Sequence, residues 1–517
     1  MASPIPAVLL IISLAGPVSA QELTPADSAR HLLNRLAFGP RPGEIAEVAA
    51  SGVLRFADQV LGRNRPDDPA LAERERSFNP ERFASATLLK RIEEAQRLRR
   101  RAQADSAAMQ TPTRSADNPR RTIVAYQQLT LVRAITARDQ LREVMVDFWT
   151  NHFNVFVNKG ADRGYLPEYI ETVIRPRALG RFEDLLVATA QSPAMLFYLD
   201  NVRSVAPGTQ PPRRIRDDSL RARFPTGLNE NYARELMELH TLGVDGGYTQ
   251  HDVTEVARIL TGWSIGSPRR GSSFVFREQA HDFGAKTVLG MRFPAGHGMD
   301  EGKRLLHLLA TNPATMHHVS RKLCARFVAD DPPDGCVDAA VHAWQESDGQ
   351  ILAVLGAIVH SPEFWSTQAV GTKVKSPLEF IVSAARAAAI IPDTAPALAL
   401  TLGRLGQPLF QQASPAGYPE READWVNSGA LLQRMNIAVA LASGRIQGSA
   451  PDLSRLTASS ADGGGLVQDL NHELFADRMS ARTRDAITHE LVDLADADTE
   501  RVLAVGLALG SPEFQQQ

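Results

Sequence analysis

The sequence predicts a mainly α-helical protein, organised as one large helical domain over residues 21–517 with a small β-hairpin insertion. Three observations favour this fold class. Apolar residues recur at the three- and four-residue spacing of a helix face, as at Val253, Val256, Ala257 and Leu260. Capping residues and prolines stand where such runs begin. The composition of the 517 residues, with 44% hydrophobic and 22% charged, is typical of a globular protein with a sizeable core.

The first twenty residues are interpreted as a signal peptide. Residues 8–16 read VLLIISLAG, which is an apolar run of the length found in secretory leaders. Val18 and Ala20 then supply the small side chains that a signal peptidase requires. A short N-terminal anchor is the alternative. No later stretch contains the roughly 18 apolar residues of a membrane span. We therefore expect a mature protein without a transmembrane segment, exported to the periplasm or secreted.

Helices are expected to dominate the first half of the mature chain. Pro40, Pro42 and Gly43 separate the first helix from the second. The segments with helical patterns are residues 28–36, 44–52, 83–107, 129–148 and 182–190. Polar or proline-rich stretches are interpreted as flexible excursions near residues 100–120, 203–227 and 445–466.

The best-defined helix spans residues 229–242. Asn229 can cap it, and Gly243 suits the left-handed position after its last turn. Thr249 begins the next helix, with Asp252 as its capping-box partner. Two short strands, residues 273–276 and 287–289, bracket a polar loop and form the β insertion. Helical patterns then return at residues 303–310, 315–327, 337–346, 350–360 and 377–388.

Charge and cysteine content limit the possible partners. The net charge of -3 argues against a dedicated nucleic-acid-binding protein, so no nucleic-acid partner is expected. The two cysteines, Cys324 and Cys336, are separated by a turn-rich segment that could bring them together in an oxidising compartment. Their spacing does not match a zinc or haem motif. Whether they form a disulfide stays open at this point.

The densest group of chemically active side chains lies at residues 229–240, which read NENYARELMELH. At about 100° per residue, Asn231, Arg234, Glu235 and Glu238 share one face of the helix. Two carboxylates beside an arginine and an amide could act as an acid and base pair or bind a cation. The alternative is a solvated face held by ion pairs between residues four apart.

Three histidines are further candidates. His240 ends the same helix, where a buried or dipole-stabilised histidine is also common. His152 is flanked by aromatic residues, so we expect it to be partly buried and either hydrogen-bonded or bound to a metal. His281 precedes Asp282 on the polar loop. There Asp282 could orient the imidazole of a metal ligand, or simply form a turn.

Several motifs together resemble DUF1800, a bacterial family of domains of unknown function. The 229–240 segment continues as TLGVDGGYT, and the other matching motifs are WTNHF at 149–153, TGW at 261–263, HD at 281–282, LGQP at 405–408, PAGY at 415–418 and Trp425. The resemblance extends from about His31 to the C-terminus. It implies an exported protein but no defined activity. Because the polar residues named above fall on the family's motifs, the resemblance favours a functional role for them.

We therefore expect an exported enzyme, a hydrolase acting on an extracellular polymer or a small molecule. Its site would lie between the 229–240 helix, the His152 segment and the His281 loop. The catalytic candidates are Arg234, Glu235, Glu238 and His240; the substrate-binding candidates are Asn231, Trp149, Tyr248 and Trp263; the metal-ligand candidates are His152, His281 and Asp282, which would hold a divalent metal. Two alternatives stay open: a non-enzymatic binding or assembly protein with a buried polar network, and a metal-dependent oxidoreductase. The sequence leaves the oligomeric state open.

Overall fold

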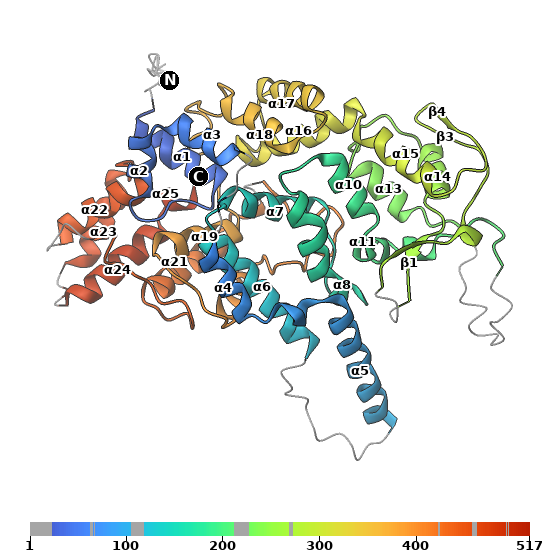
Figure 1. Ribbon diagram of the computed structural model, residues 1–517. Helices are drawn as coiled ribbons and strands as arrows, with labels where there is room; N and C mark the ends of the chain where they lie inside the picture. Colours follow the sequence, from blue (N-terminus) through green and yellow to red (C-terminus); the bar gives the residue numbers. More distant parts are fainter. Residues whose placement is uncertain are drawn as a thin grey trace, which may run out of the picture.

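The computed structural model describes residues 23–62, 66, 68–104, 118–210, 227–267, 272–421, 424–457, 463–492, 494 and 496–517. Within these ranges the chain is mainly α-helical, with only small β elements, which confirms the predicted fold class (Figure 1). The predicted signal peptide lies outside the described residues, as do most of the stretches near 100–120 and 203–227. None of the described helices has both the length and the apolar character of a membrane span.

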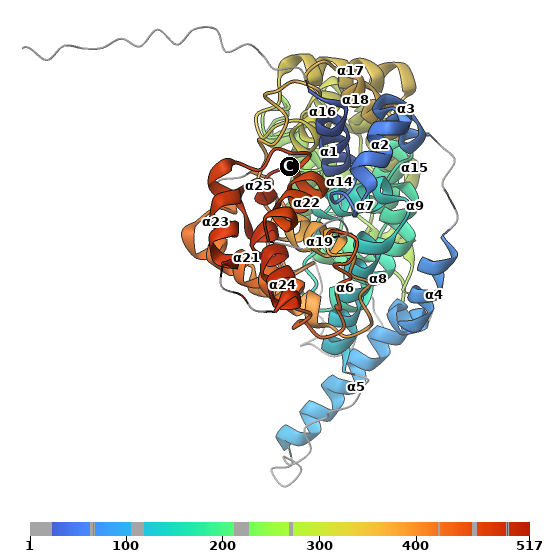
Figure 2. The ribbon, with the colours of Figure 1, turned by 90° about the vertical axis from the view of Figure 1, so that its left-hand side faces the viewer.

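The N-terminal part of the chain forms a helical corner. Thr24 caps the first helix through a capping box with Asp27, and Gly43 and Gly52 flank the second. The elements are α1 (Pro25–Leu36), α2 (Glu44–Ser51), α3 (Val53–Leu61), α4 (Pro69–Ser77), the 3-10 turn η1 (Pro80–Phe83) and α5 (Ser85–Ala104). Helix α5 projects from the body in both ribbon views (Figures 1 and 2).

The middle of the molecule is a group of helices around α7. They are α6 (Pro119–Thr136), α7 (Gln140–His152), α8 (Asp162–Tyr169), the π-turn η3 (Ile170–Ile174), α9 (Arg175–Arg177), α10 (Phe182–Ala190), α11 (Pro193–Tyr198), η4 (Asn201–Arg203), α13 (Asn231–Glu238) and α14 (Gln250–Ile259). Helix α13 is shorter than the predicted 229–242 helix, but Gly243 does take a left-handed φ of 83°. Thr249 and Asp252 form the predicted capping box of α14.

Within the described ranges, four short strands form two separate antiparallel hairpins. Strand β1 (Trp263–Ile265) pairs with β2 (Phe274–Phe276), and β3 (Lys286–Val288) pairs with β4 (Met291–Phe293), with η6 (Glu278–Ala280) between the hairpins. The two predicted strands correspond to β2 and β3, but they do not pair with each other. Leu289 and Gly290, with φ of 49° and 77°, form the tight connection that lets β3 close on β4.

The remaining helices run from the hairpins to the C-terminus. They are α15 (Met299–Ala310), α16 (Pro313–Phe327), α17 (Asp334–Ser347), α18 (Ile351–His360), α19 (Pro377–Ala387), α20 (Ala397–Arg404), α21 (Ser428–Ala442), α22 (Gly463–Phe475), α23 (Ala481–Leu491), α24 (Ala497–Gly510) and α25 (Pro512–Gln515). Cys324 and Cys336 form a disulfide between α16 and α17, with their Cα atoms 6.3 Å apart. The pairing that the sequence left open is therefore present.

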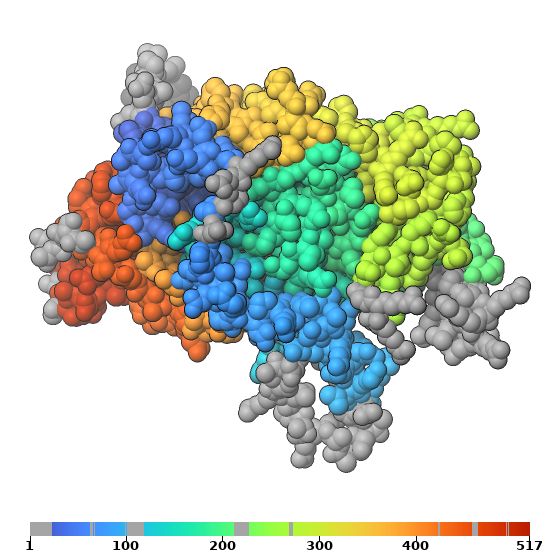
Figure 3. Space-filling model, in the orientation of Figure 1, coloured from blue at the N-terminus to red at the C-terminus, as the bar shows by residue number. Residues whose placement is uncertain are grey.

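Buried apolar side chains from α1 to α25 form one connected core. The first described helices meet the C-terminal helices, because Arg30 donates a hydrogen bond to the carbonyl of Glu513 at 3.1 Å and the N–H of Gly43 donates to Glu473 at 2.9 Å. Figure 3 shows this contact between the N-terminal (blue) and C-terminal (red) parts. Segments that are distant in sequence thus enclose α7.

Candidate functional site

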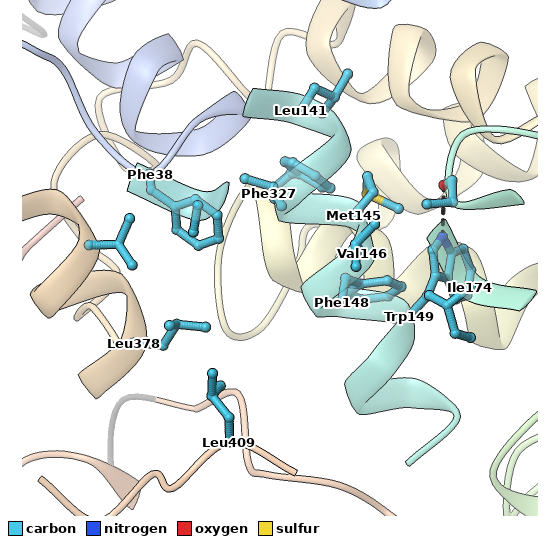
Figure 4. Close-up of a cluster of buried hydrophobic side chains, with 14 of the residues drawn as sticks. Phe38, Leu141, Met145, Val146, Phe148, Trp149, Ile174, Phe327, Leu378 and Leu409 are labelled. Carbon is cyan, nitrogen blue, oxygen red and sulfur yellow. Dashed lines mark hydrogen bonds between the residues drawn. The ribbon is translucent and has the colours of Figure 1, made fainter. Parts of the chain in front are cut away.

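Helix α7 is buried on nearly every side. Its apolar side chains pack against residues from several other elements, among them Phe38, Phe327, Leu378 and Leu409 (Figure 4). The indole N–H of Trp149 is satisfied by the carbonyl of Ala178 at 2.9 Å. Polar side chains such as Glu143 and His152 are buried on this helix along with the apolar ones. A polar side chain on such a helix therefore needs a partner or a function.

A pocket opens beside α7, between that helix and segments far from it in sequence. Its polar and charged lining residues are Asp147, Thr150, Asn151 and Asn154 from α7 and its C-terminal end, Arg326 from α16, Lys373, Ser376 and Glu379 near the start of α19, and Gln407 and Glu420 from the segment after α20. Rings of Phe148, Phe410, Tyr418 and Trp425 complete the wall. The enclosed volume of about 70 Å³ has room for a few waters or one small chemical group.

Asp147 is an unpaired carboxyl group of this pocket. No hydrogen bond or ion pair reaches its side chain from the described residues. Burial raises the pKa of Asp147 to about 7; the charge of Arg326 opposes this rise, and the charges of Glu379 and Glu420 add to it. Asp147 can therefore hold a proton near neutral pH and release it there, which a general acid or base requires.

Glu379 has the opposite environment within the same pocket. Its carboxylate pairs with Arg326 at 2.8 Å, accepts from the amide of Gln517 at 3.0 Å and caps α19 through the N–H of Ser376 at 2.8 Å. Burial alone would favour the neutral acid, but these partners lower the pKa of Glu379 to about 2. Two carboxyl groups whose pKa values are driven apart in one pocket are typical of acid and base chemistry.

The loop that follows α20 is fastened to the end of α7. The amide of Asn151 donates to the carbonyl of Tyr418 at 2.9 Å and accepts from its N–H at 2.7 Å. Asn154 donates to the carbonyls of Gln412 and Ser414. Gly417, at a φ of 79°, lies so close that a Cβ there would be 2.4 Å from the carbonyl oxygen of Asn151. The WTNHF and PAGY motifs therefore form one joint, which places Glu420 at the pocket.

Two of the predicted histidines do come together, behind the pocket wall. The rings of His152 and His240 are both buried and their centroids are 6.3 Å apart. The Nε2 atom of His152 lies 3.2 Å from the carbonyl of His240, and its Nδ1 atom lies 3.1 Å from Nζ of Lys322. Neither ring nitrogen of His240 has a hydrogen-bond partner in the described part of the chain. Burial lowers the pKa of His240 to about 3 and that of His318, on α16, to about 4, with the charge of Lys322 contributing to both.

The predicted acidic face of α13 lies elsewhere, at the surface. Tyr248 donates to Glu238 at 3.1 Å, and Arg234 binds Gln250 at 2.8 Å and lies 3.7 Å from Glu230. Glu235 is partly exposed; burial raises its pKa, and Glu238 adds to the rise. Asn231 donates to the carbonyl of Leu199 at 3.3 Å. Glu235 and Glu238 are not among the charges that shift the pKa of His152 or of His240. The structure therefore does not bring the acidic face of α13 together with these two imidazoles.

His281 and Asp282 belong to a third network at the hairpins, in which the charges pair although the second oxygen of Glu301 has no hydrogen-bond partner in the described residues. The Nε2 atom of His281 and Nζ of Lys286 both lie 2.7 Å from the same oxygen of Glu301. Arg258 binds both oxygens of Asp282, at 2.8 and 3.1 Å. With every charge paired in the interior, this network holds the second hairpin against α14 and α15.

The other predicted site residues are buried or lie apart from one another. Trp149 and Trp263 are 0% exposed, so neither presents a ring to a substrate. Trp263 packs on α15, where a Cβ on Gly302 would come within 2.2 Å of it. His152 lies in a different cluster from His281 and Asp282, and no group of three histidine, cysteine or acidic side chains suited to a metal occurs within the described ranges.

Sequence reasoning missed Asp147, Glu420, Arg326 and Lys322. A signal for Asp147 was present, since it is the single acid in the apolar run of residues 144–149 of a strongly predicted helix. An acid at such a position is buried unless the helix is exposed. The other three have no comparable signal, because their neighbours come from distant segments.

Fold and site together define a mainly α-helical protein with a carboxyl-lined pocket beside its central helix. The chain belongs to the family described as protein of unknown function (DUF1800), whose family model matches residues 31–516. Comparison with curated proteins and with solved structures finds no match. The match includes every segment that lines the pocket.

Proposed function

We propose that the protein is an exported hydrolase that cleaves a hydroxyl-rich polymer, such as a polysaccharide, with Asp147 and Glu420 as its two catalytic carboxyl groups. The observation that carries the proposal is the unpaired Asp147 carboxyl in the pocket, with a pKa of about 7 caused by burial. It is protonated often enough at neutral pH to donate a proton to a leaving group. Glu420 provides the second carboxyl group, since no described side chain pairs with it directly.

The free polar groups of the pocket favour an uncharged, hydroxyl-bearing substrate. Arg326 is engaged by Glu379, and Lys373 forms an ion pair with Asp330. These cations are therefore not free to hold an anionic substrate. The groups left over are two carboxyls and the hydroxyl of Thr150, which is buried without a partner in the described part of the chain. Such groups exchange hydrogen bonds with substrate hydroxyls.

The size and walls of the pocket support a polymer. Its volume of about 70 Å³ admits the reacting bond but not a whole chain, so the rest of the substrate would lie on the surface. Tyr418 and Trp425, with ring centroids 6.1 Å apart, form an aromatic wall on which a sugar ring can stack. A pair of acidic residues is the usual catalytic equipment for glycosidic bonds.

Export is part of the proposal. It rests on the apolar leader at residues 8–16 and is supported by the disulfide between Cys324 and Cys336, because disulfides persist mainly in oxidising compartments. An exported hydrolase meets polymers directly, which is consistent with the pocket described above.

The test is a comparison of variants on a panel of polysaccharides, with release of reducing ends as the readout. We expect the wild-type protein to release them from at least one polymer, and Asp147→Asn and Glu420→Gln to be slower by about 100-fold or more. Glu235→Gln and Glu238→Gln test the face of α13 directly. Turnover that survives in Asp147→Asn but is lost in these two would move the site to α13. No release from any polymer would overturn the substrate class.

A further inference from the structure

An open apolar groove lies where α1, α3 and the segment after α18 meet (Figure 1). Its volume of about 890 Å³ falls within the range of small-molecule sites, roughly 300–1,000 Å³. Its walls include Leu23 and Pro25 at the start of α1, Val53, Leu54 and Arg55 at the start of α3, and Trp365 after α18. None of these residues lines the pocket beside α7, so the groove is a separate site.

The register of α3 directs Leu54 toward the groove and away from the core. Val53, Phe56, Ala57 and Val60 share the face of α3 that packs on the core. At 100° per residue, Leu54 lies about 100° from that face, and it is 52% exposed. Single exposed leucines are common, but this one shares a concave surface with other apolar side chains, as in a ligand-binding groove.

Trp365 adds an aromatic ring to the opposite wall. Its indole N–H donates to the carbonyl of Val359 at 2.7 Å, so its polar atom already has a partner. The residue is only partly buried, and its ring offers a flat apolar surface to the groove. The groove therefore favours a ligand with a long apolar part.

The charge at the groove is positive. Among the described residues that line it, Arg55 is the one charged residue; it is exposed and forms no ion pair with a described side chain. Helix α3 also begins without a side-chain cap, so the N–H groups of its first turn contribute a partial charge of the same sign. A guanidinium group binds a carboxylate well, through two parallel hydrogen bonds. One cation beside one apolar groove matches a ligand with one anionic head group and one apolar chain.

We propose that the groove binds a fatty acid, whose chain lies along Leu23, Leu54 and Trp365 and whose carboxylate pairs with Arg55. The hydrocarbon chain covers apolar surface that the described chain leaves open to water, and each buried methylene group tightens binding by about fourfold. This site does not depend on the proposed hydrolase, because no residue of the pocket beside α7 takes part in it.

The first experiment detects contact between the ligand and Trp365. Dodecanoate with bromine in the middle of its chain quenches tryptophan fluorescence on contact, and it is titrated into the protein below the concentration at which it forms micelles. We expect saturable quenching that Trp365→Phe removes for the most part and that Trp425→Phe leaves in place. The other tryptophans, Trp149, Trp263 and Trp344, are at most 2% exposed. Unchanged quenching in Trp365→Phe would overturn the site.

The second experiment measures affinity by calorimetry with unlabelled dodecanoate. Leu54→Glu should weaken binding by about tenfold or more, because it places a carboxylate in the apolar groove beside that of the ligand. Leu400→Glu is the matched control, since Leu400 on α20 is 55% exposed and lies outside the groove. Circular dichroism verifies that both variants fold. Equal affinity of Leu54→Glu and the wild type would contradict the proposal.

The third experiment tests the head group. Arg55→Gln should weaken the binding of dodecanoate by about threefold or more and leave that of dodecanol unchanged. The wild type should bind dodecanoate more tightly than dodecyltrimethylammonium, whose head group is a cation. Equal affinity for the anionic and the cationic amphiphile would overturn the assignment to a fatty acid.

Other occupants of the groove give different results. If the apolar leader at residues 8–16 competes for it, dodecanoate enters more readily once residues 1–20 are removed, and that result supports the site. A second copy of the chain would appear in analytical ultracentrifugation as a dimer that Leu54→Glu dissociates. Such a dimer without uptake of dodecanoate, or no uptake by either form of the protein, overturns the proposal.

Discussion

At the scale of single residues, Asp147 shows how one partly buried carboxyl group can define a site. Its sequence neighbours on α7 are apolar, and Arg326, the cation that opposes the rise of its pKa, also pairs with Glu379. Leaving a carboxyl group in such a place costs stability whenever it is ionised. The fold also accepts such a cost at Asp162, which is 0% exposed and has no hydrogen-bond partner on either carboxyl oxygen within the described ranges. What distinguishes Asp147 is that its carboxyl group lines a pocket.

The loss of stability caused by the unpaired Asp147 carboxyl group can be measured through its pH dependence. Between about pH 4, the usual pKa of a free aspartic acid, and pH 7, the folded protein holds a proton on Asp147 that the unfolded chain has released. This contribution to the free energy of unfolding therefore falls as the pH rises through that window. Asp147→Asn removes it, so the variant should gain about 1–2 kcal/mol over the wild type between pH 5 and pH 8.

Urea unfolding at pH 5 and at pH 8 measures the stability of Asp147→Asn relative to the wild type. This measurement requires no substrate. Glu420→Gln serves as the comparison, because Glu420 is partly exposed and lines the same pocket. A stability difference between Asp147→Asn and wild type that is the same at pH 5 and pH 8 would contradict the raised pKa.

At the scale of elements, the joint between α7 and the loop after α20 positions the pocket. Gly406 and Gly417 both take left-handed φ values, 93° and 79°, so alanine is strained at either position. Only at Gly417 does a Cβ also meet backbone, 2.4 Å from the carbonyl oxygen of Asn151, whereas nothing lies within 4 Å at Gly406. Gly417→Ala must therefore push the loop away from α7.

We expect Gly417→Ala to lose about 1–3 kcal/mol more stability than Gly406→Ala. Comparison of the two variants isolates the contact with Asn151, because the energetic cost of alanine in a left-handed backbone conformation is similar at both positions. Urea unfolding of the two variants measures it, and the catalytic rate on any substrate should fall with Gly417→Ala because Tyr418 and Glu420 move. Equal losses for the two glycines would mean that the joint is not tight.

The elements also show what local sequence determines. Capping residues such as Thr249 and Asp252 and the glycine at 243 act within one turn, so they were predictable. The strands of the insertion were recognised but not their partners, because pairing depends on the turn at Leu289 and Gly290. Asp147 and Glu420 are 273 positions apart. Nothing local indicates that α19 and the loop after α20 bring them to one pocket, whereas Glu235 and Glu238 attracted attention by their proximity in sequence.

At the scale of the whole molecule, buried histidines should govern the response to acid. His31, His152, His240 and His318 come from four different elements, and burial is the first cause that lowers each pKa. In the unfolded chain each would bind a proton near pH 6.5. Below that pH the unfolded state binds more protons than the folded state, so stability falls as the pH falls. This slope is opposite in sign to that of Asp147, and four groups outweigh one.

We therefore predict that the free energy of unfolding drops by about 2–4 kcal/mol between pH 6.5 and pH 4.5. His240→Leu should reduce this drop by about 1–2 kcal/mol, because it removes a ring whose two nitrogens have no partner in the described part of the chain. His342→Leu is the matched control, since that side chain is 71% exposed beside Glu346. Urea unfolding at four pH values provides the comparison. A flat profile for the wild type, or an equal effect of the two leucine variants, would show that proton uptake by the core histidines does not limit stability in acid.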